Sequence, residues 1–214
     1  MSELEARSPE DHEHHWSGAL PAQSRSTGGA VAGTMHRMRA LFLAALVAAV
    51  SPAQAEIYDN KSVPIYLETP AGFTIRPATV EGQDLALNID LAVGSPGRAA
   101  GEAHLCQLRF KAVTVQQTQE WFNARMKDET LLAQARVALE EVLTLRSETP
   151  FALGDVVGRE YVGLSRENPK AVAVFSMVVT PRGRLTMNCM LRAEYADSTL
   201  TVVRMIRDSI RPPK

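Results

Sequence analysis

The chain has 214 residues, 45% of them hydrophobic, and a formal net charge of −1. Four of its 23 basic and five of its 24 acidic residues precede residue 56, so 19 of each remain in residues 56–214. A balanced charge creates no field that attracts nucleic acid, so we expect no nucleic-acid partner. Residues 56–214 are long enough to form a single domain with one core.

Residues 1–34 are polar and rich in turn-forming residues, and they show no apolar periodicity that could build a core. We expect this stretch to be a spurious or disordered extension, with translation starting at Met35 or Met38. The alternative is a cytoplasmic extension on an uncleaved anchor. His12, His14 and His15 resemble a metal-binding cluster, but they lie in this stretch, so we expect no metal site there.

Residues 35–55 have the three parts of a secretory signal peptide. A short basic start, MHRMR, precedes the apolar run ALFLAALVAAV, and the small residues Ala53 and Ala55 mark a cleavage site. The 11-residue run is shorter than the roughly 20 residues that span a bilayer, so we expect no transmembrane anchor. The mature protein is expected to begin at Glu56 and to be periplasmic or secreted.

The first part of the predicted domain reads as short strands. Residues 63–67 and 73–76 flank the turn Pro70-Ala71-Gly72 and are predicted to form a hairpin. Residues 85–92 and 103–113 are predicted strands, separated by a loop at 94–97. That loop lacks the lysine and the following helix of a phosphate-binding loop.

Residues 114–145 have apolar side chains at spacings of three and four, which predicts helix. The stripe starts at Trp121 and Phe122 and runs to Val142 and Leu143. The polar residues 127–129 are expected to divide it into two helices, with Asp128 as the N-cap of the second.

After Pro150 the apolar residues alternate with a period of two. Residues 156–164, 171–180 and 184–193 are predicted strands, and 171–180 should be central because both of its faces are apolar. Asp197 is the expected N-cap of a last helix at 198–210. This order predicts an α+β fold in which helices cover an antiparallel sheet.

The Pro70-Ala71-Gly72-Phe73 turn, the meander of residues 156–193 and the amphipathic closing helix resemble the PsbP-like family. This family includes the photosystem II extrinsic protein and DcrB-type bacterial envelope proteins. The resemblance spans nearly all of residues 57–210 and implies a PsbP-like sandwich with a non-enzymatic binding or assembly role. The metal-binding histidines associated with the photosystem member have no counterpart, because His104 is the only histidine after residue 55.

Cys106 and Cys189 are the only cysteines, and an even count in an oxidising compartment favours a disulfide. Each lies on the apolar side of a predicted strand, as a bridged pair in a core would. Such a bridge would stabilise the fold by roughly 4 kcal/mol. The alternative is two separate buried thiols that pack as small hydrophobic residues.

Catalytic patterns are weak. His104 shares an alternating face with Cys106, but two ligands are too few for a structural zinc, so we expect no metal site and no cofactor. A hydrolase that used His104 as its base would need a nucleophile, and no Gly-x-Ser-x-Gly motif surrounds a serine. We therefore expect the protein not to be an enzyme.

Two groups of residues are candidate binding sites. Arg204, Arg207 and Arg211 lie on one face of the closing helix, where they either complement its negative C-terminal end or form a docking strip for an acidic partner or anionic lipid. Trp121 and Phe122 are expected to pack in the core, and the alternative is that they line a pocket for an apolar ligand.

The sequence thus predicts an exported, soluble, non-catalytic binding or accessory protein of the cell envelope, whose partner belongs to an envelope protein complex. The alternative is a periplasmic carrier of a small hydrophobic ligand. A cryptic hydrolase based on His104 is the third hypothesis.

Overall fold

The computed structural model describes residues 54–91, 99–100, 104–113 and 115–213. They lie in one compact unit, Ser51–Lys214. The predictions for residues 1–34, for the signal segment up to Ala53, for the histidine cluster and for the loop at 94–97 therefore fall outside the described residues.

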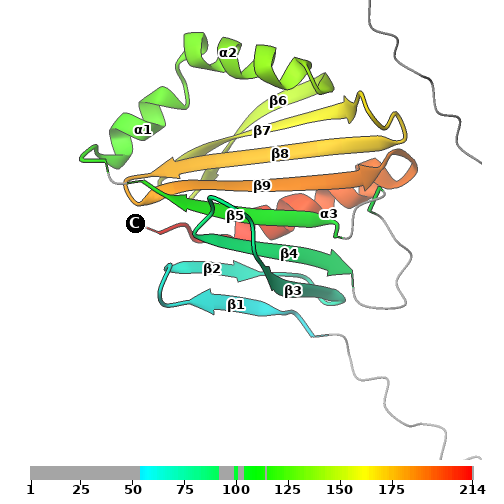
Figure 1. Cartoon of the computed structure of the whole chain (residues 1–214), viewed down its shortest axis with the longest axis horizontal. Helices are drawn as coiled ribbons and strands as arrows, with labels where there is room; N and C mark the ends of the chain where they lie inside the picture. Colours follow the sequence, from blue (N-terminus) through cyan, green and yellow to red (C-terminus); the bar gives the residue numbers. More distant parts are fainter. Residues whose placement is uncertain (1–53, 92–98, 101–103, 114, 214) are drawn as a thin grey trace, which may run out of the picture. The chain divides into compact units, whose positions relative to one another are not determined.

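The described chain forms a seven-stranded antiparallel sheet, a separate two-stranded sheet and a small number of helices (Figure 1). The strand order of the large sheet is β3-β4-β5-β9-β8-β7-β6, and β1 pairs with β2. The strands are β1 Ile57–Asn60, β2 Ile65–Glu68, β3 Phe73–Ala78, β4 Leu85–Leu91, β5 Cys106–Ala112, β6 Leu143–Leu153, β7 Val156–Ser165, β8 Ala171–Thr180 and β9 Gly183–Arg192. The predicted α+β class with an antiparallel sheet covered by helices is confirmed.

The meander β7-β8-β9 follows directly from the period-two pattern of the sequence. The predicted central strand is β8, which has β7 on one side and β9 on the other. The tight turn into β9 ends at Gly183, where an added Cβ would lie 2.4 Å from the backbone oxygen of Lys111. A side chain at this position would therefore push β5 away from β9.

The predicted helical segment contains α1 Gln119–Arg125 and α2 Glu129–Glu140. Asp128 begins α2 as predicted, because its Oδ1 accepts hydrogen bonds from the backbone N–H of Thr130 at 3.0 Å and of Leu131 at 3.4 Å. These bonds satisfy backbone donors that the first turn of a helix leaves free.

The extension of the helix to residue 145 is wrong, since β6 begins at Leu143. A register shift between Leu145 and Ser147 interrupts the alternation of buried and exposed side chains in β6, so the sequence shows no clear period of two. Pro150 lies within β6, which is tolerated because β6 is the last strand of the sheet and needs no second partner.

The predicted hairpin between residues 63–67 and 73–76 is also wrong. Both segments are strands, but β2 pairs with β1 and β3 pairs with β4. The turn between them is present, with Gly72 at a φ of 88° and the Phe73 N–H donating to the Pro70 carbonyl. In this case the turn connects two different sheets.

Helix α3, Ala196–Ser209, follows the short 3-10 turn Ala193–Tyr195, and its N-cap is Tyr195. Asp197 therefore lies in the first turn of the helix, and its prediction as the N-cap is wrong. Val203 and Ile206 of α3 are fully buried, and α3 contacts β9 and β2. The main core lies between α3 and the large sheet.

A buried ion cluster fixes α3 to the sheet. Glu160 of β7 is fully buried, and its Oε1 accepts hydrogen bonds from Arg204 Nε at 2.9 Å and Nη2 at 2.7 Å. Its Oε2 accepts from Arg207 Nη1, and the Arg207 guanidinium lies 4.3 Å from the ring centre of Phe151. The buried carboxylate is thus fully compensated by two side chains of α3.

Removing the charge of Glu160 should strongly destabilise the fold. In Glu160→Gln the buried Arg207 would keep only the half-exposed Asp208 as an acidic partner, and breaking a buried ion pair costs about 3 kcal/mol. Urea unfolding followed by circular dichroism measures the loss. Glu129→Gln, which removes an exposed partner of Arg136, is the control and should change the midpoint little. Equal midpoints for the two variants would contradict the structural role of the cluster.

Candidate functional site

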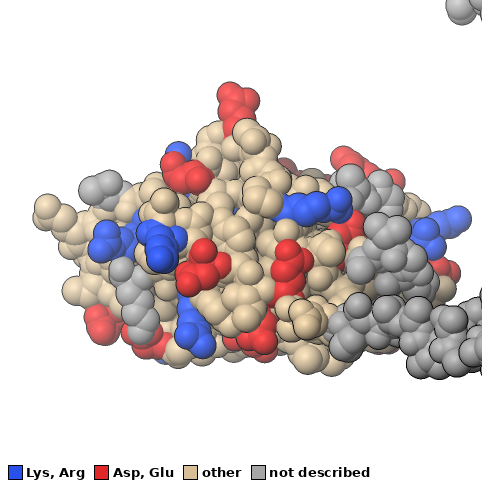
Figure 2. Space-filling view, turned by 90° about the horizontal axis from the view of Figure 1, so that it is seen from below, with Lys and Arg blue, Asp and Glu red and all other residues tan. Residues whose placement is uncertain are grey.

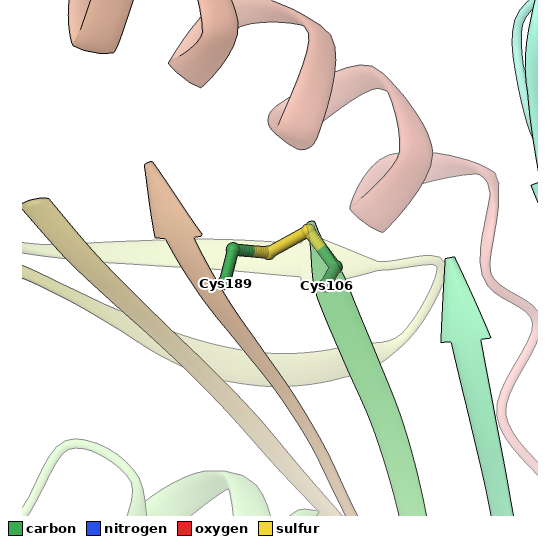
Figure 3. The surroundings of a disulfide bond; sticks show 2 residues. All are labelled: Cys106 and Cys189. Atoms are coloured by element: carbon green, nitrogen blue, oxygen red, sulfur yellow. A yellow bond between two sulfur atoms is a disulfide. The ribbon is translucent and has the colours of Figure 1, made fainter. Parts of the chain in front are cut away.

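Cys106 and Cys189 are opposite each other in the register of β5 and β9 and form a disulfide. Their Cα atoms are 4.0 Å apart, and both residues are buried. Figure 3 shows the bridge on the side of the sheet that faces α3. It links strands that are 83 residues apart in sequence, at the middle of the large sheet.

On the other side of the sheet, the described helices α1 and α2 contact β6, β7 and β8. Asn123 of α1 bonds to the backbone of the β6–β7 turn region, donating to the Asp155 carbonyl at 2.8 Å and accepting from the Val157 N–H at 2.9 Å. Arg159 Nε donates to the carbonyl of Met126, just after α1, at 2.8 Å. These bonds fix the helical segment over one half of this side.

A second ion cluster lies beneath α2. Glu148 of β6 pairs with Arg136 at 2.8 Å and with Arg159 at 3.5 Å. Hydrogen bonds to Glu129 and Glu148 raise the pKa of the Arg136 guanidinium. Burial, and then the charge of Glu148, raise the pKa of the Tyr161 phenol, which therefore stays protonated. The cluster fixes α2 to the sheet and gives no sign of a reactive group.

The remaining half of this side, over β4, β5 and β9, is not covered by any helix of the described chain (Figure 1). Asn88, Gln107 and Asn188 stand in one row across these three strands. Gln107 Nε2 donates to Asn88 Oδ1 at 2.8 Å, and Gln107 Oε1 accepts from Arg109 Nε. Asn88 therefore holds the amide of Gln107, which in turn orients the guanidinium of Arg109.

A cavity of about 130 Å³ lies on this row, and we name it the Arg109 pocket. It is lined by His104, Leu105, Gln107, Arg109, Asn188 and Met190. Asn188 Oδ1 is buried and has no hydrogen-bond partner among the described residues. The pocket thus offers guanidinium and imidazole donors together with an unused acceptor, which is the chemistry of a polar binding site.

Sequence reasoning singled out neither Gln107, Arg109 nor Asn188. The available signal is the alternation of polar residues with buried ones along β5, where Gln107 and Arg109 interrupt Cys106, Leu108 and Phe110. His104 was predicted to share the side of Cys106. It precedes β5, so it is not part of that strand, and it lines the Arg109 pocket.

Trp121 and Phe122 have different environments. Phe122 is 7% exposed and belongs to the core, as expected. Trp121 is 42% exposed, with the Arg125 guanidinium 5.2 Å from its ring centre, so its expected core position is wrong. The two rings meet edge to face at 5.0 Å.

Arg204, Arg207 and Arg211 do not form one exposed strip. Arg207 is 7% exposed, and Arg204 and Arg207 share the carboxylate of Glu160. The Arg211 guanidinium lies 4.6 Å from the ring centre of Tyr66, to whose backbone Arg211 also bonds. The assignment of all three arginines to an exposed face is therefore wrong for Arg207.

No group of three or more His, Cys, Asp or Glu side chains in the described part of the chain could hold a metal ion. Likewise, none of the described helices is long and apolar enough to cross a membrane. Ala55, on one side of the predicted cleavage site, is exposed. The next residue, Glu56, accepts hydrogen bonds from the Thr69 N–H at 2.9 Å and from the Ile75 N–H at 2.7 Å.

Comparisons with known proteins indicate a fold but no family. No protein-family model and no curated protein matches the chain. LpqN of Mycobacterium tuberculosis, described as involved in cell envelope biogenesis, aligns with a TM-score of 0.50 at 12% identity, over 75% of this chain and 91% of that one. At this identity the likeness concerns the fold alone.

Two further solved structures align less well. CyanoP, the PsbP of Synechocystis sp. PCC 6803, gives a TM-score of 0.45 at 13% identity, over 76% of this chain and 95% of that one. PA94 of Pseudomonas aeruginosa, a protein of unknown function, gives 0.39 at 9% identity, over 75% and 99%. No family model supports the PsbP-like resemblance expected from the sequence, so membership of that family stays a prediction.

Loss of the disulfide should lower stability by about 4 kcal/mol, the chain-entropy estimate for a loop of this length. The double variant Cys106→Ala/Cys189→Ala and the wild-type protein are compared in urea with and without dithiothreitol. Reductant should lower the wild-type midpoint and leave that of the double variant unchanged. A wild-type midpoint insensitive to a reductant that demonstrably frees both thiols would contradict this expectation.

Trp121 and Phe122 provide a matched pair for the packing of α1. Phe122→Ala should cost about 3 kcal/mol because it opens a cavity beneath α1. Trp121→Ala should change the urea midpoint far less, because the indole is half outside the fold. A larger loss in Trp121→Ala than in Phe122→Ala would show that the indole, and not the phenyl ring, anchors the helix.

Proposed function

We propose that residues 56–214 form an exported, non-catalytic binding or accessory domain of the cell envelope, and that residues 35–55 are its signal peptide. The Cys106–Cys189 disulfide carries the proposal, because such bonds persist in oxidising compartments and are rare in the cytosol. Its position supports a structural role, since the buried bridge joins neighbouring strands in the middle of the sheet.

The contacts of Glu56 support cleavage after Ala55. Gln54 and Ala55 are exposed, whereas Glu56 is bonded to the backbone of Thr69 and Ile75. A signal peptidase could therefore reach the bond between residues 55 and 56 without disturbing the fold. The domain would keep every described strand and helix after processing.

The surroundings of His104 support a binding role over catalysis. The residues that line the pocket beside it supply neither a serine or cysteine nucleophile nor a carboxylate that could orient the imidazole. Both cysteines are consumed by the disulfide. In the part of the chain that the structure describes, the one histidine thus lacks the partners of an acid-base mechanism.

Two further observations agree with an accessory role at the envelope. LpqN, which shares the fold, is described as involved in cell envelope biogenesis, and this is an analogy at the level of the fold. Figure 2 shows basic and acidic side chains interspersed over the face seen from below, without a field of one sign. We therefore expect recognition through a local site and a partner in an envelope complex.

The intact mass of the protein recovered from the periplasm tests the proposal. After expression of the full chain in a bacterium, the expected product begins at Glu56 and is two hydrogen atoms lighter than the reduced chain. The variant Ala55→Phe should retain the signal peptide, because the peptidase requires a small residue there. A cytoplasmic product that retains residues 35–55 would overturn the proposal.

A further inference from the structure

Arg109 has no acidic partner in the part of the chain that the structure describes, although two other basic residues on the same side of the sheet do. Arg76 pairs with Asp90 at 3.7 Å and Lys111 with Asp84 at 3.5 Å. Arg109 is half-buried, and its Nε donates a hydrogen bond to the neutral amide of Gln107. A partly buried charge without a counterion is costly, and a bound anion would remove that cost.

The guanidinium of Arg109 is held in place before any ligand binds. Gln107 is 7% exposed, and its amide nitrogen is bonded to Asn88, so its oxygen is committed to Arg109 Nε. The two Nη groups have no acceptor among the described residues and remain available. Two parallel donors of this kind match the two oxygens of a carboxylate.

The side chain of Asn188 indicates a second property of the ligand, a hydrogen-bond donor. Asn188 lines the same pocket, and its Oδ1 is buried and has no partner among the described residues, so a ligand reaches this atom only when the side chain rotates. A buried acceptor without a partner costs free energy that a ligand O–H or N–H would recover. The ligand should therefore carry a hydrogen-bond donor beside its anionic group.

The size and walls of the pocket limit the ligand further. A volume of about 130 Å³ accommodates a group the size of roughly four water molecules. Met190, which is partly exposed, provides apolar surface for the carbon atoms of such a group, whereas Leu105 in the lining is fully buried. Lys111 and Arg184 lie opposite each other beyond Arg109, outside the pocket lining, and Lys111 is paired with Asp84.

We propose that the Arg109 pocket binds a carboxylate whose adjacent carbon carries a hydroxyl or amide donor. The carboxylate is bound by Arg109, and the donor is bound by Asn188 Oδ1. This chemistry is shared by a free 2-hydroxy acid and by the C-terminal end of a peptide. The inference rests on the proposed binding role and specifies the ligand for it.

Nuclear magnetic resonance of the Arg Nε–Hε signals tests the inference on the oxidised protein as purified. Lactate should shift the Arg109 signal to saturation, and propionate, which lacks only the hydroxyl, should bind about tenfold more weakly, as one hydrogen bond predicts. N-acetylalanine, which carries an N–H donor instead, tests the peptide source. All titrations are made at equal ionic strength.

Three variants separate the contributions. Arg109→Lys keeps the positive charge but loses the two-pronged donor, so lactate binding, followed in this variant through the side-chain amide signals of Gln107 and Asn188, should fall at least about tenfold. Asn188→Ala should remove the difference between lactate and propionate. Arg76→Gln, on the same side but exposed and paired with Asp90, is the control and should bind lactate like the wild type. The urea midpoint of each variant confirms that it is folded.

Small parallel shifts of every exposed arginine would show unspecific attraction and overturn the inference. Inorganic phosphate that binds as tightly as lactate would overturn the carboxylate class. Failure of this test is separate from failure of the proposed export, because the titration reports binding and the periplasmic mass reports processing.

Discussion

The buried carboxylate of Glu160 is the constraint on which the arrangement of this fold depends. Apolar contacts such as those of Val203 and Ile206 favour burial of α3 but do not fix its position along the sheet, since the hydrophobic effect has no direction. The bonds from Arg204 and Arg207 do fix it, because a shift by one turn would leave a charge buried without its partner. One face of the sheet is thereby assigned to α3.

The other face then determines where a ligand can bind. The short helices α1 and α2 contact β6, β7 and β8, where Asn123, Arg136 and Arg159 hold them. The half over β4, β5 and β9 has no described helix above it, and the polar side chains of Asn88, Gln107 and Arg109 on this half bond to one another. The Arg109 pocket lies in this half, on the opposite side of the sheet from the disulfide.

Sequence patterns within a few residues correctly predicted the elements that depend on short-range interactions. The strands β7, β8 and β9 follow from period-two alternation, and the start of α2 follows from the capping side chain of Asp128. Strand β6 could not be recognised because its register shift breaks the period of two. The pairing of β2 with β1 depends on residues that precede the predicted hairpin. The burial of Arg207 could not be predicted, because its partner Glu160 is 47 residues away and neither residue differs locally from a surface charge.

The difference between local patterns and long-range packing also explains why the Arg109 pocket could not be predicted from the sequence. The alternation in β5 shows that Gln107 and Arg109 face away from the core, but no sequence pattern tells whether a helix covers that face. The structure shows that two charged residues of the sheet have different environments. Glu160 is fully buried and has two cationic partners, whereas Arg109 is half-buried and has no acidic partner among the described residues. A fold that compensates its deepest charge so completely can tolerate the second only because water still reaches it. A ligand that excludes this water must bring an anion of its own, and this requirement makes the pocket selective.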